Sequence, residues 1–458
     1  MLKGADQMKL QMCVWAFHSI ECCTPGHRLA TGKLNVLRGV FIGATLLWAS
    51  AGHAINLTEM QALALNNREI VRQYMTTLEQ SEQDIIRAKG GYYPFADVAY
   101  TANRLDEGGV FENRENYAAE GRIGWNIFAG FRDKYTIQSA EIRNEIERFK
   151  LQGIEQDVQL NVALAYLEVY ERRANLEVAE SAFQTLGKVY RDGESRYQVG
   201  LIGKNELLKF RVDYDDADIT AKAAEAGLKK SINVLSRQVG REISLDDLDF
   251  AEFGILPPLV DKEEYSAKML VARSEIKALE LGVDAAAAQA EAEKGGYYPR
   301  VDVVGSYRKY YNYSLSDFGG IGGVGGGVDD DELRAQMVLS MNLFQGHTTE
   351  ATVARARLQS RALQYELEEL KNVLRTDLNN LHIDFQVSLE NVEVATRSIE
   401  QAQENLRITQ LKYDEGLQRE SDLLDAITSL SRSRYNHVAV QRTAFANKFR
   451  LTRMIDGF

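Results

Sequence analysis

The feature that most constrains this chain is an internal repeat, because three short motifs occur twice and in the same order. Lys-Gly-Gly-Tyr-Tyr-Pro at 89–94 returns at 294–299, Asn-Ile-Phe-Ala-Gly at 126–130 returns as Asn-Leu-Phe-Gln-Gly at 342–346, and Tyr-Gln-Val-Gly-Leu at 197–201 returns as Tyr-Asp-Glu-Gly-Leu at 413–417. The first motif returns after 205 positions and the other two after 216. Motifs repeated at a nearly constant interval indicate two copies of one structural unit.

Residues that break helices are rare between these motifs. From His347 to Glu415 there is no glycine or proline, and Leu374, Leu378, Leu381 and Phe385 recur at spacings of three and four. This pattern predicts an amphipathic helix about 100 Å long at a rise of 1.5 Å per residue. The same reasoning predicts an equivalent long helix at 131–199. It also predicts return helices at 201–238 and 417–456, and opening helices at 57–89 and 263–294.

The hydrophobic period changes to two after each Tyr-Tyr-Pro. Val301 and Val303 alternate with Asp302, and Met337 and Leu339 alternate with more polar positions. Alternation of this kind is typical of strands with one apolar face, so we expect strands within about 92–128 and 297–344. Four strands cannot close a barrel, which needs about eight or more. The sequence therefore predicts that several copies of the chain join their strands, and three copies would supply twelve.

The first 54 residues differ from the rest of the chain. Lys33 and Arg38 precede an apolar run at 40–51, and the small-residue sequence Gly-His-Ala follows at 52–54. This order predicts a secretory signal peptide at 1–54, cleaved after Ala54. A membrane anchor is the alternative, but the run is shorter than the roughly 20 apolar residues that a spanning helix needs.

The remainder divides at a pair of adjacent prolines. Pro257-Pro258 cannot continue a helix, so it predicts a linker at 257–262. The first structural repeat is then expected at 55–256, as helix, strand, strand, long helix and return helix, and the second at 263–458.

Composition argues against several classes of protein. The formal net charge of -12 disfavours nucleic acid as a partner. All three cysteines, Cys13, Cys22 and Cys23, lie in the expected leader, so no disulfide or thiolate metal site is expected in the mature chain. The histidines beyond the leader have no metal-ligand spacing, and we find no nucleophile motif. We therefore expect no metal, no cofactor, no catalytic residue and no enzymatic activity.

The doubled motifs, together with the leader and the unbroken helices, make residues 55–458 resemble the TolC family of outer-membrane efflux and type I secretion channel proteins. The resemblance implies an α+β fold of mostly long helices that assembles as a homotrimer. It implies a twelve-stranded β-barrel, four strands per protomer, in the outer membrane of a Gram-negative bacterium, continued by an α-helical barrel in the periplasm. The implied function is a passive exit duct of a tripartite efflux pump or type I secretion system, gated at its periplasmic end. The implied partners are other copies of the chain, a periplasmic adaptor protein, an inner-membrane transporter and outer-membrane lipid.

The resemblance also implies roles for the two Gly-Leu turns. Gly200-Leu201 and Gly416-Leu417 would form periplasmic tips that dock the adaptor. Glycine permits a positive φ there, and leucine offers an apolar contact in water. An ordinary helix end is the alternative interpretation, and the two are compatible.

Two acidic positions follow the second turn. Asp422 and Asp425 are three residues apart and so share a helix face. They match the position of the acidic constriction in TolC-like ducts, where three copies would bring six carboxylates together and favour cation binding. A solvated helix face is the alternative for both residues.

The last predicted features are a latch and the junctions between helices and strands. In the family, a tyrosine-to-acid hydrogen bond holds the tip closed, and the equivalent positions here are Tyr413 and Glu206. The family's partner arginine falls on Gln418, so we expect Asn205 and Arg419 to form a different latch. The junctions are expected at Pro94, Pro299, Gly130 and Gly346.

One alternative to the duct shares many of these features. A soluble periplasmic coiled-coil adaptor or scaffold would also have a leader and long helices. It would not require the alternating strands or their duplicated junctions. A conventional porin is disfavoured because strands would fill most of its sequence.

Overall fold

The computed structural model describes residues 55–107, 114–311 and 331–458, and the predicted signal peptide at 1–54 lies outside them. The first half contains α1 (Leu57–Asn67), α2 (Glu69–Lys89), η1 (Gly90–Tyr92), β1 (Phe95–Arg104), β2 (Glu115–Ala129), α3 (Arg132–Gln198) and α4 (Lys204–Val239). Two short 3₁₀ helices, η2 (Leu245–Asp247) and η3 (Ala251–Gly254), follow. The second half contains α5 (Lys262–Ala272), α6 (Ser274–Glu293), η4 (Lys294–Tyr297), β3 (Arg300–Tyr311), β4 (Asp331–Ser340), α7 (Thr348–Asp414) and α8 (Glu420–Met454). The predicted fold of mostly long helices with two internal repeats is confirmed.

The opening helix of each half is broken, and the sequence prediction of one continuous helix was wrong in both. The first half breaks at Arg68 (φ -74°, ψ 124°) and the second at Arg273 (φ -57°, ψ 118°). Neither break contains glycine or proline. Each arginine reaches a backbone carbonyl at the end of a return helix: Arg68 Nη1 donates to the oxygen of Arg237, and Arg273 Nη1 to that of Arg453. Contacts distant in sequence therefore accompany both breaks.

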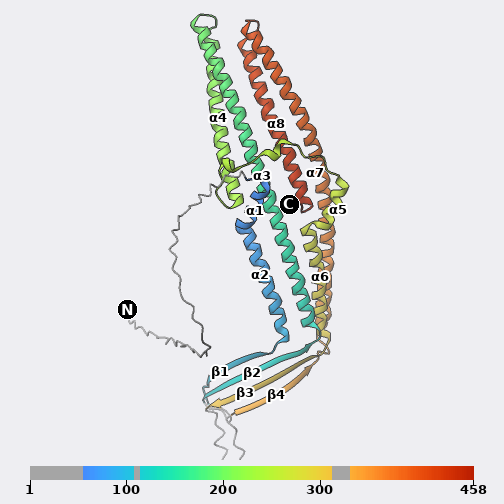
Figure 1. Ribbon diagram of the computed structural model, residues 1–458. Helices are drawn as coiled ribbons and strands as arrows, with labels where there is room; N and C mark the ends of the chain where they lie inside the picture. The colour runs from blue at the N-terminus through green and yellow to red at the C-terminus, as the bar shows by residue number, and fades with distance from the viewer. Residues whose placement is uncertain (1–54, 108–113, 312–330) are drawn as a thin grey trace, which may run out of the picture. The chain divides into compact units, whose positions relative to one another are not determined.

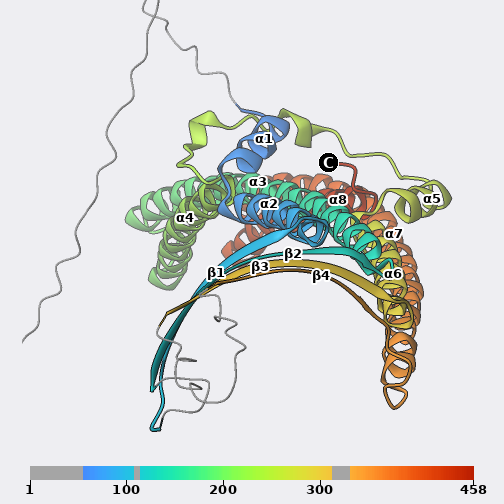
Figure 2. The same cartoon turned by 90° about the horizontal axis from the view of Figure 1, so that it is seen from below.

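The four strands form one antiparallel sheet in the order β1-β2-β3-β4. Phe95 lies opposite Gly124 in the first hairpin, and Arg300 lies opposite Ser340 in the second. The pairing of β2 with β3 joins the two halves, with a register shift between Asn126 and Phe128. Seen from below, the sheet is curved, and β1 and β4 form its two edges (Figure 2).

Within residues 55–458, the sheet lies at one end of the long helices and the two helical hairpins end at the other (Figure 1). Hairpins α3–α4 and α7–α8 run side by side toward these tips (Figure 1). The largest core cluster lies where α1, α3 and α4 meet the segment after α4, around Tyr166 and Phe253. No helix in the described ranges has the length and apolar character needed to cross a membrane.

Candidate functional site

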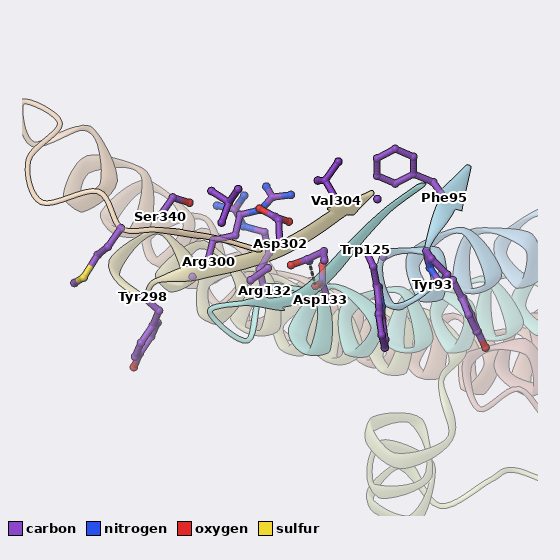
Figure 3. Close-up of a pocket in the computed structure, with 18 of the residues that line it drawn as sticks. Tyr93, Phe95, Trp125, Arg132, Asp133, Tyr298, Arg300, Asp302, Val304 and Ser340 are labelled. Atoms are coloured by element: carbon purple, nitrogen blue, oxygen red, sulfur yellow. Dashed lines mark hydrogen bonds and ion pairs between the residues drawn. The ribbon is translucent and has the colours of Figure 1, made fainter. Parts of the chain in front are cut away.

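The sheet has two faces of opposite character, because successive side chains of a strand point to opposite sides. The side that includes Trp125 and Leu339 is mostly apolar and the other side is mostly polar. In Figure 3, Tyr93, Trp125 and Tyr298 project to one side of the sheet, and Phe95 and Val304 to the other. Large apolar side chains are exposed on the apolar side of all four strands: Val98, Tyr100, Ile123, Trp125, Tyr307, Tyr311, Leu333, Met337 and Leu339.

The polar face carries ion pairs both between strands and within a strand. Arg308 Nε lies 3.1 Å from Glu120 Oε2 on the neighbouring strand, and Arg300 Nε lies 2.7 Å from Asp302 Oδ2. In each pair, the positive guanidinium and the negative carboxylate compensate each other's charge. One face of the sheet is thus suited to water and the other to an apolar medium.

The predicted junctions lie where strands and helices meet. Pro94 directly precedes β1, and Pro299 directly precedes β3. Gly130 (φ 65°) and Gly346 (φ 58°) lie in the left-handed region just before α3 and α7. A Cβ on Gly130 would lie 2.6 Å from the carbonyl oxygen of Gly295, so only glycine permits this contact between the halves.

The two predicted tip turns are the same structure. Gly200 (φ 76°) and Gly416 (φ 73°) both adopt the left-handed conformation. The N–H of Leu201 donates to the carbonyl of Arg196, and the N–H of Leu417 to that of Lys412, each over 2.8 Å. These bonds close α3 and α7 by the Schellman pattern, which satisfies carbonyls at the helix ends. The leucines are left 74% and 79% exposed, so each tip presents an apolar side chain to its surroundings.

The first acidic position caps its own helix. Asp422 Oδ2 accepts a hydrogen bond from the N–H of Arg419 over 3.3 Å, and Glu206 Oε2 accepts one from Gly203 over 3.1 Å. These carboxylates satisfy free N–H groups and complement the positive end of the helix dipole.

The second acidic position, Asp425, is exposed on α8. Burial, and then the carboxylates of Asp216 and Asp425, raise the pKa of Asp213. Negative charge therefore already concentrates between α4 and α8 within one chain.

The predicted latch residues are not hydrogen-bonded to one another in the described part of a single chain. Two ion pairs missed by the sequence analysis join the hairpins instead. Arg196 Nη2 lies 3.2 Å from Asp414 Oδ1, and Lys209 Nζ lies 3.0 Å from Glu420 Oε1. All four charged residues lie close to the repeated turns in the sequence. Which of them pair is decided by how the two hairpins lie side by side, which the sequence does not show.

The predicted latch tyrosine lies within this group. The Arg196 guanidinium lies 4.9 Å from the centre of the Tyr413 ring, which also packs edge-on against Phe210. Burial raises the pKa of Tyr413 above its ordinary value. Tyr413 therefore joins α7 to both helices of the first hairpin.

Comparison with known proteins shows what this chain is similar to. Residues 266–457 match the family described as outer membrane efflux protein. The chain is similar to outer membrane efflux proteins over this range and to TolC proteins over most of its length. It is 21% identical over 417 residues to the outer membrane protein TolC of Vibrio cholerae, covering 88% of this chain and 93% of that protein. It is also 23% identical to TolC of Escherichia coli, covering 89% of this chain and 85% of that protein.

Solved structures of membrane proteins share the fold of this chain. The outer membrane protein VceC of Vibrio cholerae aligns with a TM-score of 0.70 at 17% identity, covering 88% of this chain and 96% of that one. A membrane protein from Pseudomonas aeruginosa aligns with a TM-score of 0.73 at 14% identity, covering 88% and 91%. The matched family is one of outer membrane efflux proteins rather than of enzymes.

Proposed function

We propose that three copies of this chain form a passive exit duct in the outer membrane, through which a tripartite efflux pump or a type I secretion system expels its cargo. The exposed apolar face of the four-stranded sheet carries this proposal. Residues such as Val98 and Leu333, 90% and 83% exposed, would be unfavourable in water and favourable against lipid. The polar face would then line the water-filled interior.

The sheet also supports assembly into a closed barrel. Strands β1 and β4 are its edges, and lipid tolerates no unpaired strand edge. Pairing each β4 with β1 of another copy removes every edge. Three copies give twelve strands, enough for an open barrel.

The helical tips support a gate and a docking end in the periplasm. Leu201 and Leu417 would contact the periplasmic adaptor protein, which connects the duct to an inner-membrane transporter. Three copies of Asp422 and Asp425 would line the constriction. Within each chain, Arg196 with Asp414 and Lys209 with Glu420 would hold the two hairpins together in the closed state.

Membrane fractionation combined with unheated electrophoresis tests this function. We expect the protein in the outer-membrane fraction, migrating as a trimer without heating and as a monomer after boiling. A soluble periplasmic protein would contradict the proposal and leave the coiled-coil adaptor or scaffold as the better interpretation.

A further inference from the structure

Two glycines in the interior of α3 lie against aromatic rings of α4. A Cβ on Gly187 would lie 3.0 Å from Cε2 of Tyr214, which is a tight contact. A Cβ on Gly193 would lie 2.6 Å from Cδ2 of Phe210 and 2.9 Å from its Cε2, well inside the distance at which two carbon atoms repel each other. Glycine at 193 therefore allows the Phe210 ring to lie directly on the backbone of α3.

Helix stability does not explain a glycine at this position. In the interior of a helix, glycine is the least favourable residue after proline, because it has the most backbone freedom to lose. The other long helix, α7, has no glycine along its 67 residues. The close approach of Phe210 accounts for Gly193 where helix propensity does not.

The Tyr214 ring belongs to a stack within the first hairpin. It lies between Phe183 and Tyr190 of α3, with ring centroids 5.0 and 5.8 Å away. The ring planes are close to parallel, at 13° and 6°. Gly187 therefore serves the packing of α3 against α4, the two helices of one hairpin.

The Phe210 ring instead reaches the second hairpin, which runs beside the first (Figure 1). Phe210 is only 1% exposed, and its ring packs edge-on against Tyr413 of α7 with centroids 6.5 Å apart. It also shares a buried apolar cluster with Leu423 and Leu424 of α8. Because both hairpins enclose the ring, its depth against α3 sets how closely the hairpins approach each other.

The two leucines connect this cluster to the proposed constriction. Leu423 is fully buried and Leu424 is 9% exposed. They lie between Asp422 and Asp425 in the first turns of α8. Close-packed interiors contain few voids, so a shift of one side chain is passed on to its neighbours. Displacement of the leucines would therefore move the backbone that carries both carboxylates.

We propose that Gly193 and Phe210 are positioning residues for the closed constriction. The ring fills the space that the missing Cβ leaves beside α3, and this depth allows the first hairpin to approach Tyr413 and the start of α8. The inference rests on the proposed exit duct. It assigns the closure of the tip to a buried contact outside the predicted latch.

The ion pairs between the hairpins agree with this assignment. Lys209 pairs with Glu420 of α8 over 3.0 Å, and Arg196 pairs with Asp414 of α7 over 3.2 Å. All four side chains are partly exposed, and water and salt weaken such pairs. Burial of an aromatic ring stabilises a contact far more than an exposed ion pair does. The Phe210 ring is therefore the stronger link, and the ion pairs form at the separation that it sets.

Gly193→Ala tests this contact in planar bilayers. The added Cβ would meet the enclosed ring and push it towards Tyr413, although alanine is the better helix former. Overpacking of a buried site shifts an equilibrium appreciably, so the ratio of open to closed time in single-channel recordings should rise at least about fivefold. Block by a trivalent cation from the periplasmic side should weaken in parallel.

Gly187→Ala is the matched control. It adds the same methyl group to the same helix six residues earlier, against a ring of the same partner helix. That ring belongs to the stack within the first hairpin, so the ratio of open to closed time should equal that of the wild type. An equal rise in both variants would show that any strain in α3 opens the tip, and would overturn the role of Phe210.

A compensating change shows whether the effect passes through the ring. Phe210→Leu leaves space beside α3, so alone it should also loosen the tip. In combination with Gly193→Ala, the smaller leucine leaves room for the added methyl group, and the ratio should return towards the wild-type value. A double variant as open as Gly193→Ala alone would overturn the direct contact.

Unheated electrophoresis shows whether each variant is trimeric. If Gly193→Ala did not assemble but the double variant did, the clash with Phe210 would be demonstrated by assembly itself. Phe210→Leu alone, which creates space instead of a clash, would then decide the role in closure. A ratio of open to closed time equal to that of the wild type in Phe210→Leu would overturn that role.

These outcomes separate the inference from the proposed function. Wild-type protein that forms no channels would overturn the duct and the inference together. Wild-type channels whose closure is unaffected by Gly193→Ala would overturn the inference and leave the duct. A ratio that rises in Gly193→Ala and falls back in the double variant would support both.

Discussion

The guanidinium of Arg273 donates a hydrogen bond to the carbonyl oxygen of Arg453 over 2.6 Å, at the last turn of α8. A cation at this end of a helix is favoured by the helix dipole. The side chain of Arg453 in turn is only 5% exposed, and its guanidinium binds Asp157 of α3, Glu275 of α6 and Asp456, three residues further along the chain. The end of α8, the break between α5 and α6, and the middle of α3 are thereby fixed together.

This network predicts that Arg453→Ala is strongly destabilising. The variant leaves three carboxylates without their shared cation, so we expect a loss of about 3–5 kcal/mol in the free energy of unfolding. Arg237→Ala at the equivalent position of α4 is the matched control, and should cost less than about 1 kcal/mol because that side chain is exposed. Denaturant unfolding followed by helical circular dichroism measures both. Equal losses would show that the network adds no stability.

The same network predicts acid sensitivity. Burial alone would raise the pKa of Glu275, but Arg273 and Arg453 outweigh it and hold that pKa below the ordinary value of 4.5. Because the folded pKa is depressed, the stabilisation is present above pH 4.5 and is lost as the pH falls through the folded pKa. Glu275→Gln should therefore be less stable at pH 7 and show a smaller decrease in Tm between pH 7 and pH 3. A decrease in Tm equal to that of the wild type would contradict this role.

The sequence predicted the long helices and the strands because their hydrophobic periods are local properties of the chain. It did not predict the breaks at Arg68 and Arg273, where no helix-breaking residue marks the site. Those arginines bond to carbonyls 169 and 180 residues away. The doubled turns located the tips, yet the ion pairs that join them depend on how two separate hairpins lie side by side. The local sequence pattern therefore identified the helices and strands. The helix breaks and the pairing of charges between hairpins depend on contacts between residues far apart in the sequence.

The contact of Arg196 with Tyr413 and Asp414 predicts a leakier tip when it is removed. Arg196→Gln deletes both the ion pair and the cation above the ring, which should loosen the two hairpins from each other. We expect larger single-channel conductance in planar bilayers. Arg191→Gln removes an exposed arginine five residues earlier on α3 and should leave conductance unchanged. If the two variants behaved alike, Arg196 would have no part in closure.

The exposed leucines at the tips predict a loss of docking without a loss of folding. Leu201→Ser combined with Leu417→Ser removes apolar surface that one chain leaves in solvent, so the melting temperature of the trimer should be unchanged. Export by the complete pump should fall, together with cross-linking of the duct to its adaptor. Val199→Ser, at a position 70% exposed beside the first turn, is the matched control and should leave export unchanged if docking depends on the leucines. Full export by the double leucine variant would place docking elsewhere.

The acidic positions after the second turn predict a block of the duct by multivalent cations. Three copies would bring together six carboxylates from Asp422 and Asp425, and their mutual repulsion would favour a bound cation. Asp422→Asn with Asp425→Asn removes the charge, while the asparagine at 422 retains an oxygen that can accept the capping bond from the N–H of Arg419. Block by a trivalent cation added from the periplasmic side should weaken at least about tenfold. Asp215→Asn with Asp218→Asn on α4 removes the same charge from outside the proposed constriction, so it should retain the block. Retention of the block by the first variant would assign the constriction to other residues and leave Asp422 as a helix cap.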